Sequence, residues 1–95
     1  MTNEFQELLQ KYANRIELFL KENDFKEKAE QDHAFWVGYI KYCINTNYNS
    51  LCNEIFKLLL RDKVLICNNS IYRKKYYYKE FNIEKTKKLQ SLQWD

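Results

Sequence analysis

The chain has almost none of the residues that usually interrupt secondary structure, since its 95 residues include no proline and a single glycine, Gly38. This excludes a glycine-rich loop for binding phosphates. Histidine is represented by His33 alone, and no serine or cysteine stands in a recognisable nucleophile motif. His33 follows Asp32, but neighbouring side chains on a helix point about 100° apart, which argues against an acid–base pair. The sequence therefore predicts no catalytic residue and no enzyme.

Cysteine is also sparse. Cys43, Cys52 and Cys67 are widely spaced, and no two of them have the Cys-x-x-Cys spacing of zinc and redox sites. We expect all three to be buried thiols, because an unoxidised cysteine packs like a small apolar residue. The acidic residues within 27–32 are interpreted as a solvated face rather than a metal cluster. No metal and no cofactor are predicted.

Long apolar runs are absent. No segment approaches the roughly 18 uncharged residues that a membrane span requires. The start, MTNEFQELLQ, lacks the basic and then apolar pattern of a secretory signal. We therefore expect a cytoplasmic protein without membrane contact. With 45% apolar and 17% aromatic residues, the chain has the balance of one globular domain, which we place over residues 1–95.

Residue usage is skewed in a way that points to the genome. Phe, Tyr, Met, Ile, Asn and Lys together supply 45 residues, whereas Gly, Ala, Arg and Pro supply 7. Codons of the first group are AT-rich and those of the second are GC-rich. We expect an AT-rich genome, such as that of a low-GC bacterium, its phages or its mobile elements.

Residues 3–22 are predicted to form an amphipathic helix. Their apolar side chains fall on one stripe about 120° wide at 100° per residue. Part of this stripe has the 4, 3, 4, 3 spacing of two heptads, which allows the helix to pair with a second copy. The heptad positions are Phe5, Leu9, Tyr12, Ile16 and Phe19. The charged residues 24–32 then form either an exposed turn or the polar start of the next helix.

Residues 33–45, HAFWVGYIKYCIN, are predicted to form a second helix capped by Asp32. The segment is apolar almost all round, which indicates a central helix buried on several sides. Gly38 in its interior costs about 1 kcal/mol relative to alanine, so we expect another helix to cross closely there.

A third helix is predicted over residues 50–62, after the polar turn TNYNS, with Asn49 or Ser50 as its cap. One broad arc of this helix is apolar and the opposite face is polar. Leu60 falls among the polar residues, so we expect it to meet either a following hairpin or a partner.

Residues 63–67, KVLIC, have the β-branched, apolar composition of a strand. Asparagine tolerates the left-handed backbone, so residues 68–70, NNS, are predicted to form a tight turn. The returning strand is IYRKKYYYKEF, residues 71–81, with four positive charges and five aromatic rings. A last helix beginning at Asn82 is one interpretation of the tail. The predicted fold is mainly α with a small β-hairpin, of the α+β class.

This order of elements resembles the winged helix-turn-helix superfamily. The resemblance covers about residues 33–81, where NSLCNEIFKLLLRDKVLICNNSIYRKKYYYKEF is similar to a third helix followed by a wing. It implies that the third helix lies in the DNA major groove and that the hairpin contacts the flanking backbone or minor groove. The residues then expected to contact bases and phosphates are Asn49, Ser50, Asn53 and Lys57. An ordinary solvated face is the alternative for these side chains.

Charge is concentrated near the end of the chain. Residues 1–60 hold 7 basic and 9 acidic side chains, a balance of −2, whereas residues 61–95 hold 9 and 4, a balance of +5. A basic ribbon attracts phosphates by releasing counterions, and tyrosines within it can stack on unpaired bases at about 1–3 kcal/mol each. We therefore predict single- or double-stranded DNA binding at the hairpin. Its predicted contact residues are Arg73, Lys74, Lys75, Tyr76, Tyr78 and Lys79.

A second hypothesis assigns the same hairpin a structural role. In it, Tyr76 and Tyr78 pack on the helices, and the lysines keep an exposed sheet edge soluble. The protein is then an interaction module, such as an accessory subunit, an inhibitor or an adaptor. It binds its partner through the first helix or the hairpin edge. The sequence leaves both hypotheses open.

Overall fold

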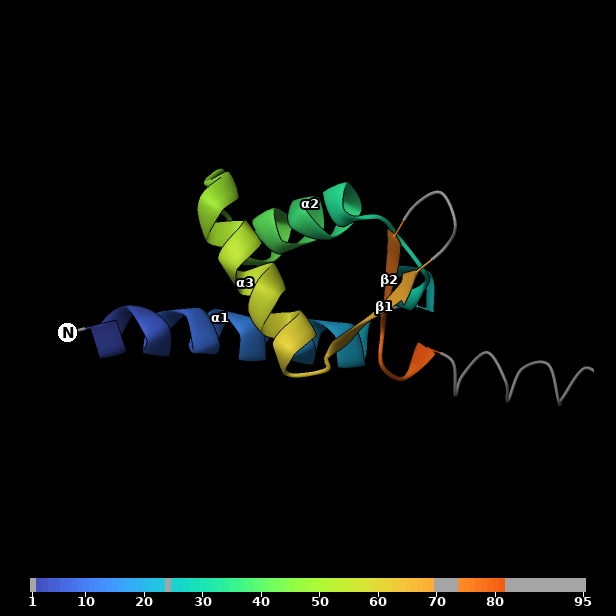
Figure 1. Ribbon diagram of the computed structural model, residues 1–95, viewed down its shortest axis with the longest axis horizontal. Helices are drawn as coiled ribbons and strands as arrows, with labels where there is room; N and C mark the ends of the chain where they lie inside the picture. Colours follow the sequence, from blue (N-terminus) through green and yellow to red (C-terminus); the bar gives the residue numbers. More distant parts are fainter. Residues whose placement is uncertain (1, 24, 70–73, 82–95) are drawn as a thin grey trace, which may run out of the picture.

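The computed structural model describes residues 2–23, 25–69 and 74–81 (Figure 1). Helix α1 runs along one side of the molecule, α2 and α3 lie over it, and a β-hairpin stands at one end (Figure 1). The predicted class, mainly helical with a small hairpin, is confirmed. The elements are α1 (Thr2–Glu22), the short 3-10 helix η1 (Phe25–Lys28), α2 (His33–Ile44), α3 (Asn49–Arg61), β1 (Leu65–Asn69) and β2 (Lys74–Tyr78).

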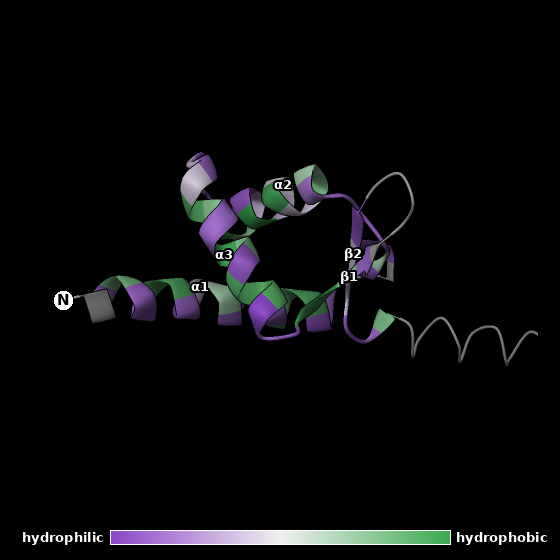
Figure 2. Cartoon of the chain, in the orientation of Figure 1, coloured by the Kyte–Doolittle hydropathy of each residue, from purple (hydrophilic) through white to green (hydrophobic). Residues whose placement is uncertain are grey.

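Helix α1 matches the predicted amphipathic helix. Green and purple alternate along its ribbon in Figure 2, and its apolar stripe faces the other helices. The buried part of the stripe begins only at Leu9, because residues 4–8 are all exposed. The first turns of α1 extend beyond α3 (Figure 1). The buried side chains of this helix are Leu9, Ala13, Ile16 and Leu20.

Helix α2 begins as predicted, since the Asp32 carboxylate accepts a hydrogen bond of 2.9 Å from the Phe35 amide. The prediction that this helix is buried on several sides is wrong. Its outer face is exposed, and a Cβ added to Gly38 would meet no atom within 4 Å. None of the described elements crosses the helix closely at that glycine. The buried residues share one face and are Trp36, Tyr39, Ile40 and Cys43.

Helix α3 forms where the apolar arc predicts it, but its predicted cap is wrong. Asn49 and Ser50 are its first two helical residues, and Tyr48 occupies the cap position without a side-chain hydrogen bond to the helix. Leu60 is half-buried and lies beside Leu65 of β1, so it meets the hairpin. The buried arc consists of Cys52, Ile55, Phe56, Leu58 and Leu59.

The hairpin is antiparallel and shifted along the chain from its predicted position. Asn68 pairs with Lys75, and Asn69 pairs with Lys74, so both asparagines belong to the ladder and not to a tight turn. The connection between the strands spans residues 70–73, which lie outside the described residues. The interpretation of residues 82–95 as a last helix also lies outside them.

A short extended segment pairs with the hairpin along β2, on the side away from β1. The backbone of Gln31 pairs with that of Tyr76 through hydrogen bonds of 2.9 and 2.8 Å. The spatial order is therefore β1, β2 and then Gln31. This pairing connects the segment between α1 and α2 to the hairpin.

The three cysteines are thiols in different environments. Cys43 and Cys52 are buried as predicted, but Cys67 is exposed, so the prediction that all three are buried is wrong. Cys67 lies opposite Tyr76 in the ladder, so its side chain is on the same face of the hairpin as the Tyr76 ring. None of the described helices has both the length and the apolar character needed to cross a membrane.

Candidate functional site

The predicted stacking residues of the hairpin are core residues. Tyr76 is 9% exposed and Tyr78 is 0% exposed. The Tyr76 ring packs edge-on against Phe56 at 4.9 Å between centroids, and burial raises the pKa of its phenol. The Lys28 ammonium lies 5.8 Å from the centre of the Tyr78 ring. The prediction that these two rings stack on bases is therefore wrong, because they face the helices.

The described cations of the hairpin differ in their surroundings. Lys74 is exposed and Lys75 is half-buried, and neither forms an ion pair with a described residue. Lys79 donates to the Glu17 carboxylate of α1 at 2.9 Å, so its charge is already balanced. Arg73 lies outside the described residues. Among the hairpin cations that the structure describes, Lys74 and Lys75 thus remain available for an anion.

The polar face of α3 carries the other predicted contact residues. Asn49 and Ser50 are exposed in its first turn. Asn53 is half-buried, and its shielded Oδ1 accepts no hydrogen bond from the described residues. Lys57 makes an exposed ion pair of 3.3 Å with Glu54. This face therefore offers amide and hydroxyl groups, with little net charge at Lys57.

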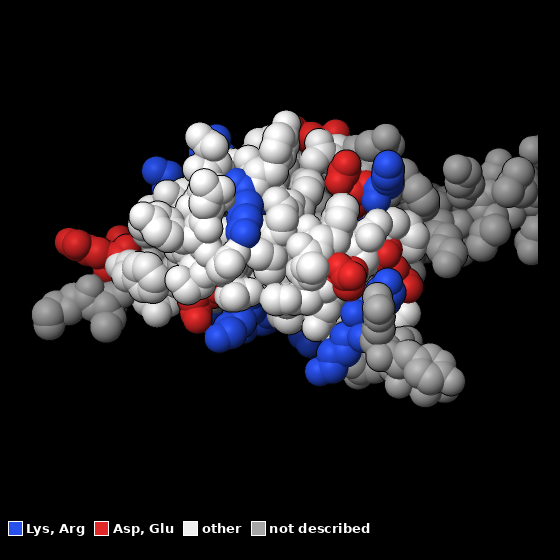
Figure 3. All heavy atoms as spheres, turned by 90° about the horizontal axis from the view of Figure 1, so that it is seen from above, with Lys and Arg blue, Asp and Glu red and all other residues white. Residues whose placement is uncertain are grey.

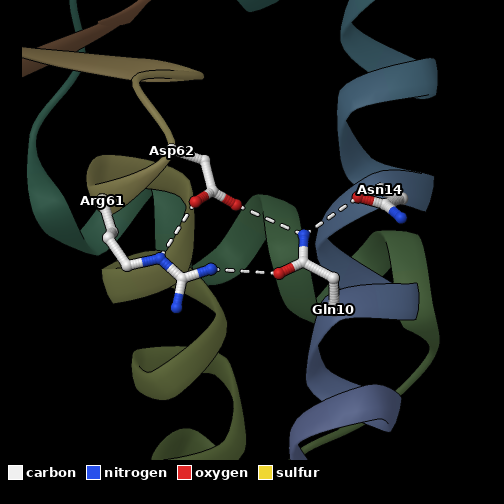
Figure 4. Close-up of polar contacts among 4 residues, drawn as sticks. All are labelled: Gln10, Asn14, Arg61 and Asp62. Carbon is white, nitrogen blue, oxygen red and sulfur yellow. Dashed lines mark hydrogen bonds and ion pairs between the residues drawn. The ribbon is translucent and has the colours of Figure 1, made fainter.

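The last turn of α3 is tied to α1 (Figure 4). Arg61 donates from Nε to Asp62 at 2.9 Å and from Nη2 to Gln10 at 3.1 Å. Gln10 in turn donates to Asp62 at 3.2 Å and to Asn14 at 3.0 Å. Hydrogen bonding from Arg61 is the main cause that lowers the pKa of the Asp62 carboxyl. Arg61 thus fixes one helix against another and is not an uncommitted cation.

His33 and the acidic patch have structural contacts. The His33 ring packs edge-on against Phe56 at 4.8 Å, and Asp32 caps α2. Glu30 accepts a hydrogen bond of 3.1 Å from Asn68 of β1. In the described part of the chain, no group of three or more His, Cys, Asp and Glu side chains is arranged to hold a metal ion.

The structure reveals exposed apolar side chains, of which the sequence singles out only Phe5, as a heptad position of the first helix. Five large ones have at least two fifths of their surface in solvent, and contiguous patches of this kind mark interaction sites more often than isolated residues do. They are Phe5 (52%), Leu8 (41%), Leu18 (56%), Tyr42 (83%) and Tyr48 (74%).

Three of these side chains line one groove, here called the α1 groove. It lies between the exposed first turns of α1 and the start of α3, and its volume is about 380 Å³. Its walls are mainly apolar, and Glu54 contributes one carboxylate. The lining residues are Phe5, Leu8, Tyr48, Ser50, Leu51 and Glu54.

A strip of charge lies beside the α1 groove on the same helix. At 100° per residue, Glu4, Leu8, Lys11 and Arg15 fall within about 60° of one another. All four are exposed. Neither Glu4 nor Arg15 forms an ion pair or side-chain hydrogen bond with another described residue. One end of this strip is acidic, and the other end is basic.

The outer face of α2 is a second exposed surface. Ala34, Gly38 and Tyr42 recur every four residues along it and are all exposed. Figure 3 shows this side of the molecule from above, where uncharged residues cover the middle and most charged residues lie toward the margins. The face is therefore suited to contacts other than with a polyanion.

Comparisons with known proteins assign no family, because no protein-family model, no curated protein and no solved structure matches the chain.

Proposed function

We propose that this protein is a non-enzymatic protein-interaction module and that the α1 groove is where it docks its partner. The observation that carries the proposal is the convergence of Phe5, Leu8 and Tyr48, all exposed, on one groove. An apolar cluster of this kind is removed from water when a partner covers it, which contributes about 25 cal/mol per Å² of apolar surface. The groove involves the first helix, as the protein-interaction hypothesis expects.

The occupant that fits this surface is a second copy of the chain. A two-fold axis midway between positions 4 and 15 sets two α1 helices antiparallel and places Glu4 of each copy beside Arg15 of the other. The acidic end of the charged strip then faces the basic end of the other copy, and the two-fold symmetry forms this pair twice. The same arrangement sets Leu8 of each copy opposite Lys11 of the other, whose aliphatic stem can cover the leucine. The surface is thus self-complementary in charge.

Sedimentation velocity over a wide concentration series tests this proposal. The chain has a mass of 11.8 kDa, and we expect a concentration-dependent shift toward twice that mass. Leu8→Glu places a charge in the α1 groove and should leave the monomer at every concentration. Leu18→Glu is the matched control, because Leu18 is also an exposed leucine of α1 but does not line the groove.

Each outcome of this experiment either supports or contradicts the proposed dimer. Loss of the dimer in Leu8→Glu but not in Leu18→Glu supports the proposal. A wild-type chain that remains monomeric at all concentrations contradicts it. Equal loss in both variants indicates that α1 associates without using the groove, which also contradicts it. Circular dichroism of each variant verifies that the helices are retained.

Binding to duplex DNA is the second candidate function. The isolated bridge between Gln31 and Tyr76 favours it, because its place between α1 and α2 is similar to that of the short strand after the first helix of winged helix domains. Asn49 and Ser50, exposed at the start of α3, are then the base-contacting candidates, and Lys74 and Lys75 contact phosphates.

Fluorescence anisotropy with labelled duplexes across a salt series tests the second candidate. The double variant Lys74→Glu, Lys75→Glu should weaken binding and reduce the salt slope by about one for each phosphate that the protein no longer neutralises. An unchanged slope, or no binding to duplexes at low salt, rejects it.

A further inference from the structure

A hollow on the outer face of α2 is here called the α2 pocket. Its volume is about 600 Å³, within the range of small-ligand sites. Gly38 forms part of its wall, and the space above this glycine is open. The lining residues are Asn23, Glu27, Ala34, Phe35, Gly38, Tyr39 and Tyr42. No described residue lies close enough to Gly38 to require a glycine there. The missing side chain at this position instead leaves room in the pocket.

Aromatic rings form much of this pocket. Phe35 and Tyr39 are one helical turn apart, and their rings are nearly parallel at 6.4 Å between centroids. Trp36 packs edge-on against both rings from the core side, which fixes their orientation. Asn23 donates a hydrogen bond of 2.7 Å to the Tyr39 hydroxyl. Two of the three rings are therefore held in place before any ligand arrives.

A third ring, that of Tyr42, and the carboxylate of Glu27 also line the pocket. Tyr42 is 83% exposed and can swing over a ligand without loss of core packing. Glu27 is the one ionisable carboxylate among the lining residues and forms no ion pair with a described residue. Burial is the main cause that raises the pKa of Tyr39, and the negative charge of Glu27 adds to it. The field of Glu27 thus reaches the ring that lines the pocket.

Rings and a carboxylate together select one class of ligand. The face of an aromatic ring attracts a cation, and cages of such rings recognise methylated ammonium groups, which are large and weakly hydrated. A neighbouring carboxylate adds Coulomb attraction without requiring a directional hydrogen bond. We infer that the α2 pocket binds a methylated ammonium group, carried either by a small molecule or by a methylated lysine side chain of another protein. This inference is independent of the α1 groove.

Nuclear magnetic resonance offers a direct readout, because Gly38 is the only glycine of the chain and lines the pocket. The probe is choline, and the control ligand is its neutral isostere, in which a tert-butyl group replaces the trimethylammonium. Choline should move the Gly38 amide signal in a saturable way and bind about fivefold more tightly than the isostere. A peptide with trimethyllysine, compared with its unmethylated form, tests the side-chain source.

Variants assign the binding to named groups. Glu27→Gln and Tyr42→Ala should each weaken choline about threefold to fivefold. Tyr48→Ala is the matched control, since Tyr48 is also a highly exposed tyrosine but lies in the α1 groove. The Leu8→Glu variant should bind choline like the wild type. The experiment therefore tests the choline site independently of the proposed dimer.

Three results would overturn the inference. The first is no saturable shift of the Gly38 signal with choline. The second is equal affinity for choline and its neutral isostere, which would indicate a merely apolar groove. The third is unchanged affinity in both Glu27→Gln and Tyr42→Ala, which would remove the proposed contacts.

Discussion

The indole nitrogen of Trp36 donates a hydrogen bond of 2.9 Å to the backbone carbonyl of Tyr76. The same carbonyl accepts the Gln31 amide at 2.9 Å, so both of its lone pairs are used. Trp36 is 0% exposed and belongs to α2, whereas Tyr76 belongs to β2. This pair therefore joins the helices to the hairpin inside the core.

Trp36→Phe should destabilise the fold by about 2 kcal/mol, because it removes the hydrogen bond and leaves space beside the smaller ring. Urea unfolding measures the loss. Tyr42→Phe is the control, since Tyr42 is 83% exposed and its change should stay within about 0.5 kcal/mol. A Trp36→Phe variant as stable as this control would show that the contact between α2 and β2 contributes little.

Gly38→Ala should stabilise the protein. The added Cβ meets no atom within 4 Å, and alanine is favoured over glycine inside a helix by about 1 kcal/mol. For a domain of this size the melting temperature should rise by about 4–8 °C. Thermal unfolding followed by circular dichroism checks this, and a lowered melting temperature would mean that the site is closed in solution.

Acid should weaken the contact between Arg61 and Asp62. The pKa of Asp62 is lowered, chiefly by hydrogen bonding from Arg61, so its stabilisation is present above the ordinary aspartate pKa and is lost as the pH falls through the lowered pKa. Asp62→Asn removes this contribution. The difference in unfolding free energy between wild type and variant should therefore shrink between about pH 7 and about pH 2. A difference that is constant with pH would contradict the assignment.

The thiols should react in two classes. Cys67 is exposed, whereas Cys43 and Cys52 are buried, and burial raises the pKa of both buried thiols. A disulfide reagent should consume one thiol rapidly and two more only after unfolding. Cys67→Ser should abolish the rapid phase. Rapid reaction of a second thiol in the folded protein would show that a buried cysteine is accessible.

The sequence predicts the helices well because their signals are local. The stripe of α1, the Asp32 cap and the apolar arc of α3 each depend on residues within a few turns. The hairpin depends on pairing instead. Asparagine suits a tight turn at residues 68–70, but the ladder extends through Asn69, because strand length is decided by the partner strand.

The sequence leaves open whether the two hairpin tyrosines are buried or stack on bases. The sequence places Tyr76 and Tyr78 on the same face of the strand, which is correct. Both faces mix lysine with aromatic residues, so the sequence alone does not show which face meets the helices. That choice depends on the packing of Phe56 against Tyr76 across 20 residues of chain.

The α1 groove could not be predicted from spacing either. Leu8 belongs to the apolar stripe of α1, and only the position at which α3 begins leaves it 41% exposed. Tyr48 belongs to a polar turn, where an aromatic residue gives no periodic signal. The proposed interface thus joins two segments that are 40 residues apart in sequence, a relationship that only the fold provides.

The central claim is that α1 pairs with the α1 helix of a second copy. The most direct test is to swap the charges of Glu4 and Arg15 by mutation. Sedimentation velocity should show that Glu4→Arg and Arg15→Glu each weaken the dimer, because each sets like charges together at two places. The double variant should restore it to nearly the wild-type level. If the single variants dimerise like the wild type, or if the double variant is weaker than either single one, the antiparallel pairing is contradicted.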